Sequence, residues 1–219
     1  MEHDGRRTLY PRTGFPALAI GKPHIMSETP FLPMLFDTPE THDPGGKVRL
    51  KLPGGIVASA EMSPCTKYRY SLERIWDITK PTILWIGMNP STADALHDDP
   101  TCAREMTFSK TWGYGQYWKA NVMDWRATFP KDIPTDPQEA ISSAGRQKLL
   151  AMASTAKMVI AAWGKPPGKL ELEARALAKT LQGLNITLYC LGTNQDGSPK
   201  HPLYLKKSLT PIPWTGYPA

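Results

Sequence analysis

The sequence predicts an α/β protein built on a central four-stranded parallel sheet. Four short apolar segments alternate with helical patterns along the chain, at 83–86, 117–123, 158–164 and 186–192. This alternation is typical of a parallel sheet with helices on both faces. Right-handed crossovers then place the carboxyl ends of the strands at one edge, where such sheets bind ligands. We therefore expect a three-layer α/β/α domain with its site at that edge.

Composition restricts the class of protein. The chain has 219 residues, of which 41% are apolar and 21% charged, as in soluble globular proteins. No apolar run approaches the ~20 residues that span a bilayer. The segment Met1–Arg7 lacks the apolar core of a signal peptide. We expect no membrane association and residence in the cytoplasm.

Cysteine content and charge restrict the cofactors and partners. Cys65, Cys102 and Cys190 show no metal-like spacing, so we expect reduced thiols and no metal or other cofactor. The net charge of +6 suits a partner made of phosphates. A slightly basic surface without such a role explains the charge equally well.

The amino-terminal region differs from the rest of the chain. Residues 1–45 contain seven of the 22 prolines and no sustained periodicity, so we expect an irregular arm followed by a single domain over 46–219. Charged and apolar residues alternate in 47–52, and an apolar segment returns at 56–60 after a Pro-Gly-Gly turn. This pattern predicts a β-hairpin. The segment 68–76 predicts a short strand or a helical turn.

The first central strand and its loop follow. Ile83–Ile86 has the β-branched and aromatic residues of a strand that is buried on both faces. The strand stops at Gly87, and Pro90 biases Asn89 towards an extended conformation. A helix is expected from about 99 to 111.

The later elements repeat this order. A second helix is expected from Asp136-Pro137 to about 155, with proline in its first turn. Apolar residues at helical spacing in 170–181 predict a third helix. After the last strand, a polar loop at 193–200 leads to the segment 201–207.

Polar or glycine residues at the strand ends are candidate site residues. Asn89 follows the first strand, Asn121 ends the second, and Gly164 follows the third. His201 lies beyond the fourth strand. All four are expected to converge at the carboxyl edge of the sheet.

The order of these motifs resembles the uracil-DNA glycosylase superfamily. Members carry G-x-N-P or G-x-D-P, a strand-end Asn, a glycine-containing third strand and a late H-P-S-P-L-type motif. The corresponding residues are Gly87-Met88-Asn89-Pro90, Asn121, Trp163-Gly164 and His201–Leu205. The stretch from Asn121 to Arg126-Ala127-Thr128 is similar to the mismatch-specific branch. Over about 60–215, N-P-S-T-A-D-A, D-D-P-T, R-A-T and H-P-L-Y-L together resemble more closely the bacterial and phage family named domain of unknown function 1643.

The resemblance implies hydrolysis of an N-glycosidic bond on a modified or non-standard DNA base. Asn89 would position the attacking water. Asp99 would act as the general base, a role that an amide cannot fill. His201 would donate a hydrogen bond to a carbonyl oxygen of the departing nucleobase. The expected substrate contacts are Met88, Pro90, Ser91, Asp98, Thr101, Asn121, Arg126 and Gly164.

The late motif is expected to contact DNA, single- or double-stranded, with the protein acting as a monomer. Tyr204 and Leu205 would wedge into the stack, while Lys206 and Lys207 would hold flanking phosphates.

Three departures from the superfamily pattern leave the identity of the substrate base undetermined. Residues 99–103 hold no aromatic to stack on a flipped base, Ser91 replaces a glycine, and Tyr204 stands among small residues. Three uses of the pocket are therefore open: binding of a modified base, binding of a free nucleotide, or a transfer reaction. Two other functions stay open: a nucleotide or base-modification enzyme that flips no base, and a catalytically silent DNA-binding module.

Each candidate also has a structural interpretation. Asn89 before proline forms turns, Asn121 suits a buried structural amide, and His201 before proline caps a turn. The pair Asp98-Asp99 suits a helix N-cap, and Lys206-Lys207 suits a solvated surface. The joint occurrence of the motifs in one order favours the functional interpretation.

Overall fold

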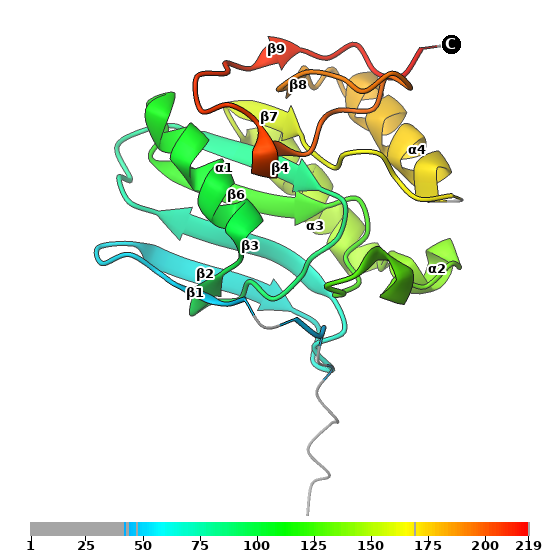
Figure 1. The fold of residues 1–219 in the computed structure, drawn as a ribbon, viewed down its shortest axis with the longest axis horizontal. Helices are drawn as coiled ribbons and strands as arrows, with labels where there is room; N and C mark the ends of the chain where they lie inside the picture. Colours follow the sequence, from blue (N-terminus) through cyan, green and yellow to red (C-terminus); the bar gives the residue numbers. More distant parts are fainter. Residues whose placement is uncertain (1–41, 43, 47, 169, 219) are drawn as a thin grey trace, which may run out of the picture. The chain divides into compact units, whose positions relative to one another are not determined.

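The computed structural model describes residues 42, 44–46, 48–168 and 170–218. In this part of the chain, seven strands form one sheet in the order β2-β3-β6-β4-β7-β8-β9 (Figure 1). The strands are β2 (Val57–Met62), β3 (Arg69–Ile75), β6 (Gln116–Asn121), β4 (Thr82–Gly87), β7 (Met158–Ala161), β8 (Leu188–Cys190) and β9 (Ile212–Pro213). The predicted arm over 1–45 lies almost wholly outside the described residues.

The sheet is mixed. Strand β4 pairs in parallel with β6 and β7, and β7 pairs in parallel with β8. Antiparallel pairs join β2 to β3, β3 to β6, and β8 to β9. The protein is thus α/β, as predicted, but its sheet is larger and more mixed than the four-stranded parallel sheet we expected. The alternation of strands and helices did not reveal the antiparallel strands at either end.

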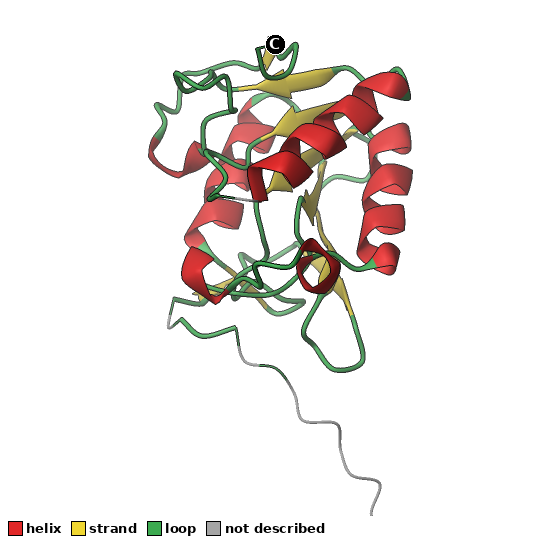
Figure 2. Cartoon of the chain, turned by 90° about the vertical axis from the view of Figure 1, so that its right-hand side faces the viewer, coloured by secondary structure: helices red, strands yellow, loops and turns green. Residues whose placement is uncertain are grey.

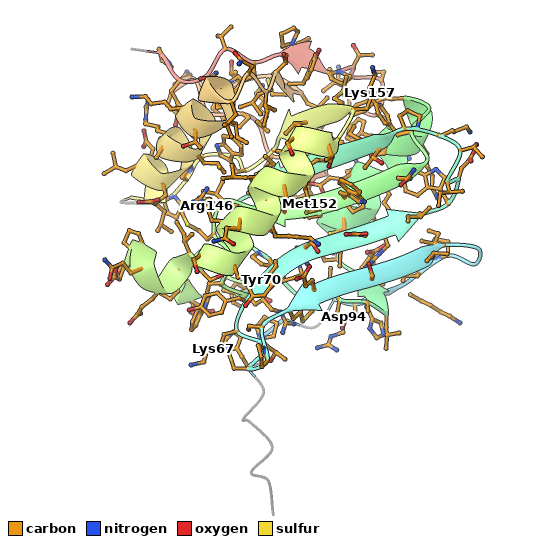
Figure 3. All side chains as sticks on the ribbon, turned by 180° about the vertical axis from the view of Figure 1, so that it is seen from behind. Lys67, Tyr70, Asp94, Arg146, Met152 and Lys157 are labelled. Carbon is orange, nitrogen blue, oxygen red and sulfur yellow. The ribbon has the colours of Figure 1, made fainter. Side chains whose placement is uncertain are left out.

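Helices cover both faces of the sheet. Helix α1 (Pro100–Thr111) lies in front of it in Figure 1, while α3 (Ser143–Thr155) and α4 (Leu170–Gly183) lie on the far face (Figures 2 and 3). Strand β4 supplies both cores because successive side chains alternate. Ile83 and Trp85 pack in the core that includes α1 residues, and Leu84 and Ile86 pack in the core that includes residues of α3 and α4.

The predicted hairpin over 47–60 is wrong. Strand β2 pairs with β3 instead, and the short strand β1 (Leu50–Lys51) pairs with β5 (His97–Asp98) in a separate ladder. Alternation identifies a strand but does not identify its partner. Here Arg74 of β3 donates to the carbonyls of Asp94 and His97, which fixes the segment that receives β1.

The predicted helix from Asp136 to 155 is two helices. Helix α2 (Pro137–Ala140) ends before Ser142, which caps α3 by accepting from the Gly145 N–H at 3.0 Å. The buried Asp124 carboxylate holds this break, because it accepts from both the backbone N–H, at 2.7 Å, and the hydroxyl of Ser142. A distant loop residue therefore decides where α3 begins.

The remaining helical predictions hold. The stripe at 170, 174, 177, 178 and 181 is buried on α4. Short 3₁₀ turns occur at η1 (Pro130–Asp132) and η2 (Pro202–Tyr204). No helix within the described residues combines the length and apolar character needed to cross a bilayer.

Gly145 yields a stability prediction. Replacing a helical glycine by alanine normally stabilises by ~0.5–1 kcal/mol. A Cβ at Gly145, however, would lie 2.1 Å from Oδ2 of Asp124. Gly145→Ala should therefore lower the free energy of unfolding by about 1–3 kcal/mol, measured by urea denaturation. Gly183→Ala is the matched control, since no heavy atom lies within 4 Å of its Cβ, and it should be neutral or stabilising. Equal effects at both positions would contradict the clash with Asp124.

Candidate functional site

A pocket lies at the carboxyl ends of β4 and β7. The chain leaves β4 towards α1 on one face and leaves β7 towards α4 on the other. Such a reversal opens a crevice in which open α/β sheets bind ligands. A pocket of about 420 Å³ is lined there by residues from 87–91, 99–101, 127–128, 163–167 and 201–203, with Arg69 and Lys119.

The pocket brings together the three predicted catalytic residues. Asn89, Asp99 and His201 all line it, although they come from segments far apart in the sequence. Four predicted substrate contacts also line it, namely Met88, Ser91, Thr101 and Gly164. Gly164 has a φ of +72°, and a Cβ there would lie 3.3 Å from Cβ of His201. Glycine thus permits both the corner after β7 and the close approach of His201.

The orientation of Asn89 is fixed by two carbonyls. Its Nδ2 donates to the carbonyl of Ala127 at 2.6 Å and to that of Pro90 at 3.0 Å. Only the nitrogen of an amide can donate to carbonyl oxygens, so these contacts decide which amide atom is which. The Oδ1 atom accepts no hydrogen bond within the described part of the chain. It is the part of Asn89 that remains for a water molecule or a ligand.

Asp99 has a structural role and also lines the pocket. It is the N-cap of α1, where its Oδ1 accepts from the Cys102 N–H at 2.8 Å. The N-cap interpretation is therefore confirmed for Asp99. The cap uses Oδ1, so Oδ2 is left to contact a ligand in the pocket.

His201 has one defined tautomer. Its Nδ1 accepts from the Leu203 N–H at 3.4 Å, which leaves the proton of the neutral ring on Nε2. The residue is exposed at the rim, yet the pocket walls displace part of the water around its ring. That desolvation, assisted by the charge of Lys119 and opposed by Asp99, lowers its pKa to about 4. A neutral His201 with a free Nε2–H is a hydrogen-bond donor at neutral pH.

Asn121 lies at the predicted strand end but beneath the pocket rather than in its lining. Its Oδ1 accepts from Nη2 of Arg69 at 3.1 Å, and Nη1 of Arg69 donates to the Ala93 carbonyl at 2.9 Å. Both side chains are buried, with 6% and 1% of their surface exposed. Within the described residues, the Nδ2 of Asn121 and the Nε of Arg69 have no hydrogen-bond partner. Asn121 therefore supports the floor instead of reading a base edge directly.

Three other predicted contacts do not line the pocket. Asp98 is buried and forms an ion pair with Arg74 at 2.9 Å; burial raises its pKa and Arg74 opposes that rise. Pro90 is buried behind the loop. Arg126 donates to the Thr66 carbonyl at 2.9 Å. These side chains hold loops in place, which sequence position alone did not distinguish from ligand contact.

The late motif is only partly available for DNA. Tyr204 is 92% exposed, and Lys206 and Lys207 are also exposed. Leu205, in contrast, is half-buried against the core that includes α1, and its carbonyl accepts from Arg104. The expectation that Leu205 is a free wedge does not fit this packing, so Tyr204 is the side chain left to project.

Sequence analysis missed Arg69 and Lys119. Lys119 is 4% exposed and forms an ion pair of 2.5 Å with Glu105 of α1. Burial raises the pKa of Glu105, while Lys119 and the Tyr117 hydroxyl oppose that rise. The sequence did contain a signal: Arg69 in β3 and Lys119 in β6 are charged residues that stand next to apolar or aromatic neighbours within a strand. Such residues are rarely buried unless they are paired or functional.

No group of three or more metal-ligating side chains occurs within the described residues. Fold and site together define a mixed α/β domain with a pocket at the ends of parallel strands, whose lining includes the cations Arg69, Lys119 and Lys165. The chain belongs to the family described as "Protein of unknown function (DUF1643)", whose model matches residues 69–203, more than half of its length. No curated protein and no solved structure gave a significant match. The link to uracil-DNA glycosylases thus rests on the motifs alone.

The His201 environment gives a testable titration. The imidazole should titrate with a midpoint near pH 4 in ¹H–¹⁵N spectra of the folded protein. Because the charge of Asp99 raises this pKa, Asp99→Asn should move the midpoint to lower pH. Asp136→Asn, at the N-cap of the remote helix α2, should leave it unchanged. A His201 midpoint near 6.5 in the parent protein would contradict the desolvated ring.

Proposed function

We propose that this protein is a DNA-base-processing enzyme that hydrolyses the N-glycosidic bond of a modified or non-standard base. One observation carries the proposal: Asn89, Asp99 and His201 line one pocket whose volume is about 420 Å³. This volume is in the range of small-molecule sites. The neighbouring parallel strands β6, β4, β7 and β8, with helices on both faces, are compatible with a uracil-DNA glycosylase-like fold.

The proposed reaction uses the three residues as follows. Oδ1 of Asn89, left free by the two carbonyl contacts of Nδ2, accepts from a water below the anomeric carbon. The water oxygen bonds to C1′ as the C1′–N bond breaks, and Asp99 takes the water proton. The bonding electrons leave with the base. Nε2–H of His201 donates to a base carbonyl as negative charge develops there.

The cationic floor supports the departure of the base. Arg69 and Lys119 are almost wholly buried, where a charge acts more strongly than it does in water. Donors aimed at developing negative charge are the largest single contribution in many enzymes. The floor thus provides stabilisation that Asn89 and Asp99 do not.

DNA is the proposed partner, bound by a monomer. Tyr204 projects at the rim, and exposed Lys206 and Lys207 follow it. These three would contact the strand that flanks an extruded base. The packing of Leu205 against the core favours one alternative, an enzyme that acts on a free nucleotide and flips no base.

The activity is tested with duplex and single-stranded oligonucleotides that each carry one modified base. Release of a free base, detected by mass spectrometry, together with alkali-sensitive abasic sites is the expected result. Turnover of free nucleotides without any base release from DNA would favour the alternative. DNA binding without either reaction would indicate a silent binding module.

Asp99→Asn separates catalysis from capping. Asparagine caps helices about as well as aspartate, so the fold should be retained while the proton acceptor is lost. Turnover should fall roughly 10²–10⁴-fold, with little change in Tm. Asp99→Ala should lose the same activity and also about 1 kcal/mol of stability. Full specific activity in the folded Asn variant would restrict Asp99 to its N-cap role.

Phosphate contacts by Lys206 and Lys207 predict a salt dependence. Each phosphate contact on duplex DNA contributes about 0.9 to the slope of log affinity against log salt. The double Lys→Gln variant should therefore reduce the slope by about 1.8. Lys157 and Lys179 are exposed and do not line the pocket; their double Gln variant is the charge-matched control and should leave the slope unchanged. Equal slopes in all three proteins would exclude these contacts.

A further inference from the structure

The floor of the pocket holds an incompletely satisfied set of donors. Arg69 is 1% exposed, and its two terminal nitrogens donate only to uncharged oxygens, those of Ala93 and Asn121. Its Nε has no hydrogen-bond partner in the part of the chain that the structure describes. A buried guanidinium normally pairs with a carboxylate, because leaving its charge uncompensated is costly.

The remaining charges near the pocket are arranged in pairs. Arg74 pairs with Asp98, and Lys119 pairs with Glu105. Asp99 also lines the pocket, but it forms no ion pair with Arg69. Arg69 is therefore a buried cation at the pocket that forms no ion pair with the described residues, although its charge acts on the Asp98 carboxylate and opposes the rise in pKa that burial causes there.

Two side chains with nitrogen donors pack closely against Gly87. A Cβ at this position would lie 2.8 Å from Nζ of Lys119 and 2.9 Å from Nδ2 of Asn121. Gly87 lines the pocket. Nδ2 of Asn121 has no hydrogen-bond partner among the described residues, and its identity is fixed because Oδ1 accepts from Arg69. Nζ of Lys119 has two contacts to Glu105 out of its three N–H groups.

We infer that Arg69 and Lys119 form an oxyanion subsite beside Gly87, with Asn121 holding Arg69 in place, and that the pocket takes a base-sized ligand carrying a negatively charged oxygen. The ligand oxygen would approach Arg69 and Lys119 from the pocket, which both residues and Gly87 line. A carboxylate or phosphate oxygen suits these donors, since charge-assisted hydrogen bonds are the strongest available to it. The inference uses the proposed function only in taking this pocket as the substrate site.

Binding to the unmodified protein tests the subsite without any reaction. Two pairs of probes differ only in the anionic group: uracil-6-carboxylate against its 6-carboxamide, and deoxyuridine 5′-monophosphate against deoxyuridine. Affinity is measured by calorimetry, and Trp163 in the pocket lining offers a fluorescence readout. In one pair, the charged member should bind about 10- to 100-fold more tightly.

Three variants locate the effect. Gly87→Ala places a Cβ against Nζ of Lys119 and Nδ2 of Asn121. It should displace these groups and abolish the preference for the charged member, although the backbone at this position does not require glycine. Arg69→Met keeps the bulk of the side chain without its charge and should do the same. Lys148→Gln is the charge-matched control; it removes a lysine of α3 that pairs with Glu61. It should retain the preference. Thermal denaturation checks that each variant is folded, and Gly87→Ala decides the question if Arg69→Met is not.

The outcomes separate this inference from the proposed function. A preference for the carboxylate supports the subsite and a ligand whose negative charge is on the base. A preference for the monophosphate alone supports the subsite and favours an enzyme that acts on free nucleotides. Equal or undetectable binding within both pairs overturns the subsite, even if the protein releases a base from DNA. A preference that survives in Gly87→Ala also overturns it.

Discussion

The buried ion pair between Lys119 and Glu105 is the interaction on which the site depends. It joins the middle of β6 to the middle of α1, and the Tyr117 hydroxyl completes it by donating to Glu105 at 2.7 Å. Breaking such a pair leaves a buried charge without its partner, at a cost of about 3–5 kcal/mol. The contact therefore fixes how α1 lies on the sheet. It thereby places Asp99, the N-cap of α1, beside the strand ends.

A second constraint joins the loops that follow β4 and β6. Val122 and Met123 donate to the carbonyls of Gly87 and Met88, and Ala127 donates to that of Pro90. Nδ2 of Asn89 lies within this ladder because it donates to Ala127. The two loops are thus one hydrogen-bonded unit. A side chain held in this way needs little reorganisation to present its free oxygen, which is the condition for efficient positioning.

The two cations of the pocket floor differ in how their charges are compensated. Lys119 is compensated by Glu105, whereas Arg69 is bonded only to neutral oxygens. Burying a charge in this way opposes folding, and functional sites are where proteins retain such costs. The cost at Arg69 would be offset by a negatively charged ligand, which links the stability of this region to its occupancy.

The sequence by itself determined the periodic elements and the positions of the strand-end motifs. The strands around 83–86 and 158–164 and the stripe on α4 follow from burial patterns that are local in the chain. Asn89, Asn121, Gly164 and His201 could be assigned to one edge because crossovers in α/β sheets share a hand. Only the tertiary structure decided the strand partners, since the pattern of β2 fits any neighbouring strand. Only the tertiary structure separated Asp99, beside the pocket, from Asp98, paired with Arg74. The inward positions of Arg69 and Lys119 became visible in the same way, because the burial of a charge depends on residues that are distant in the sequence.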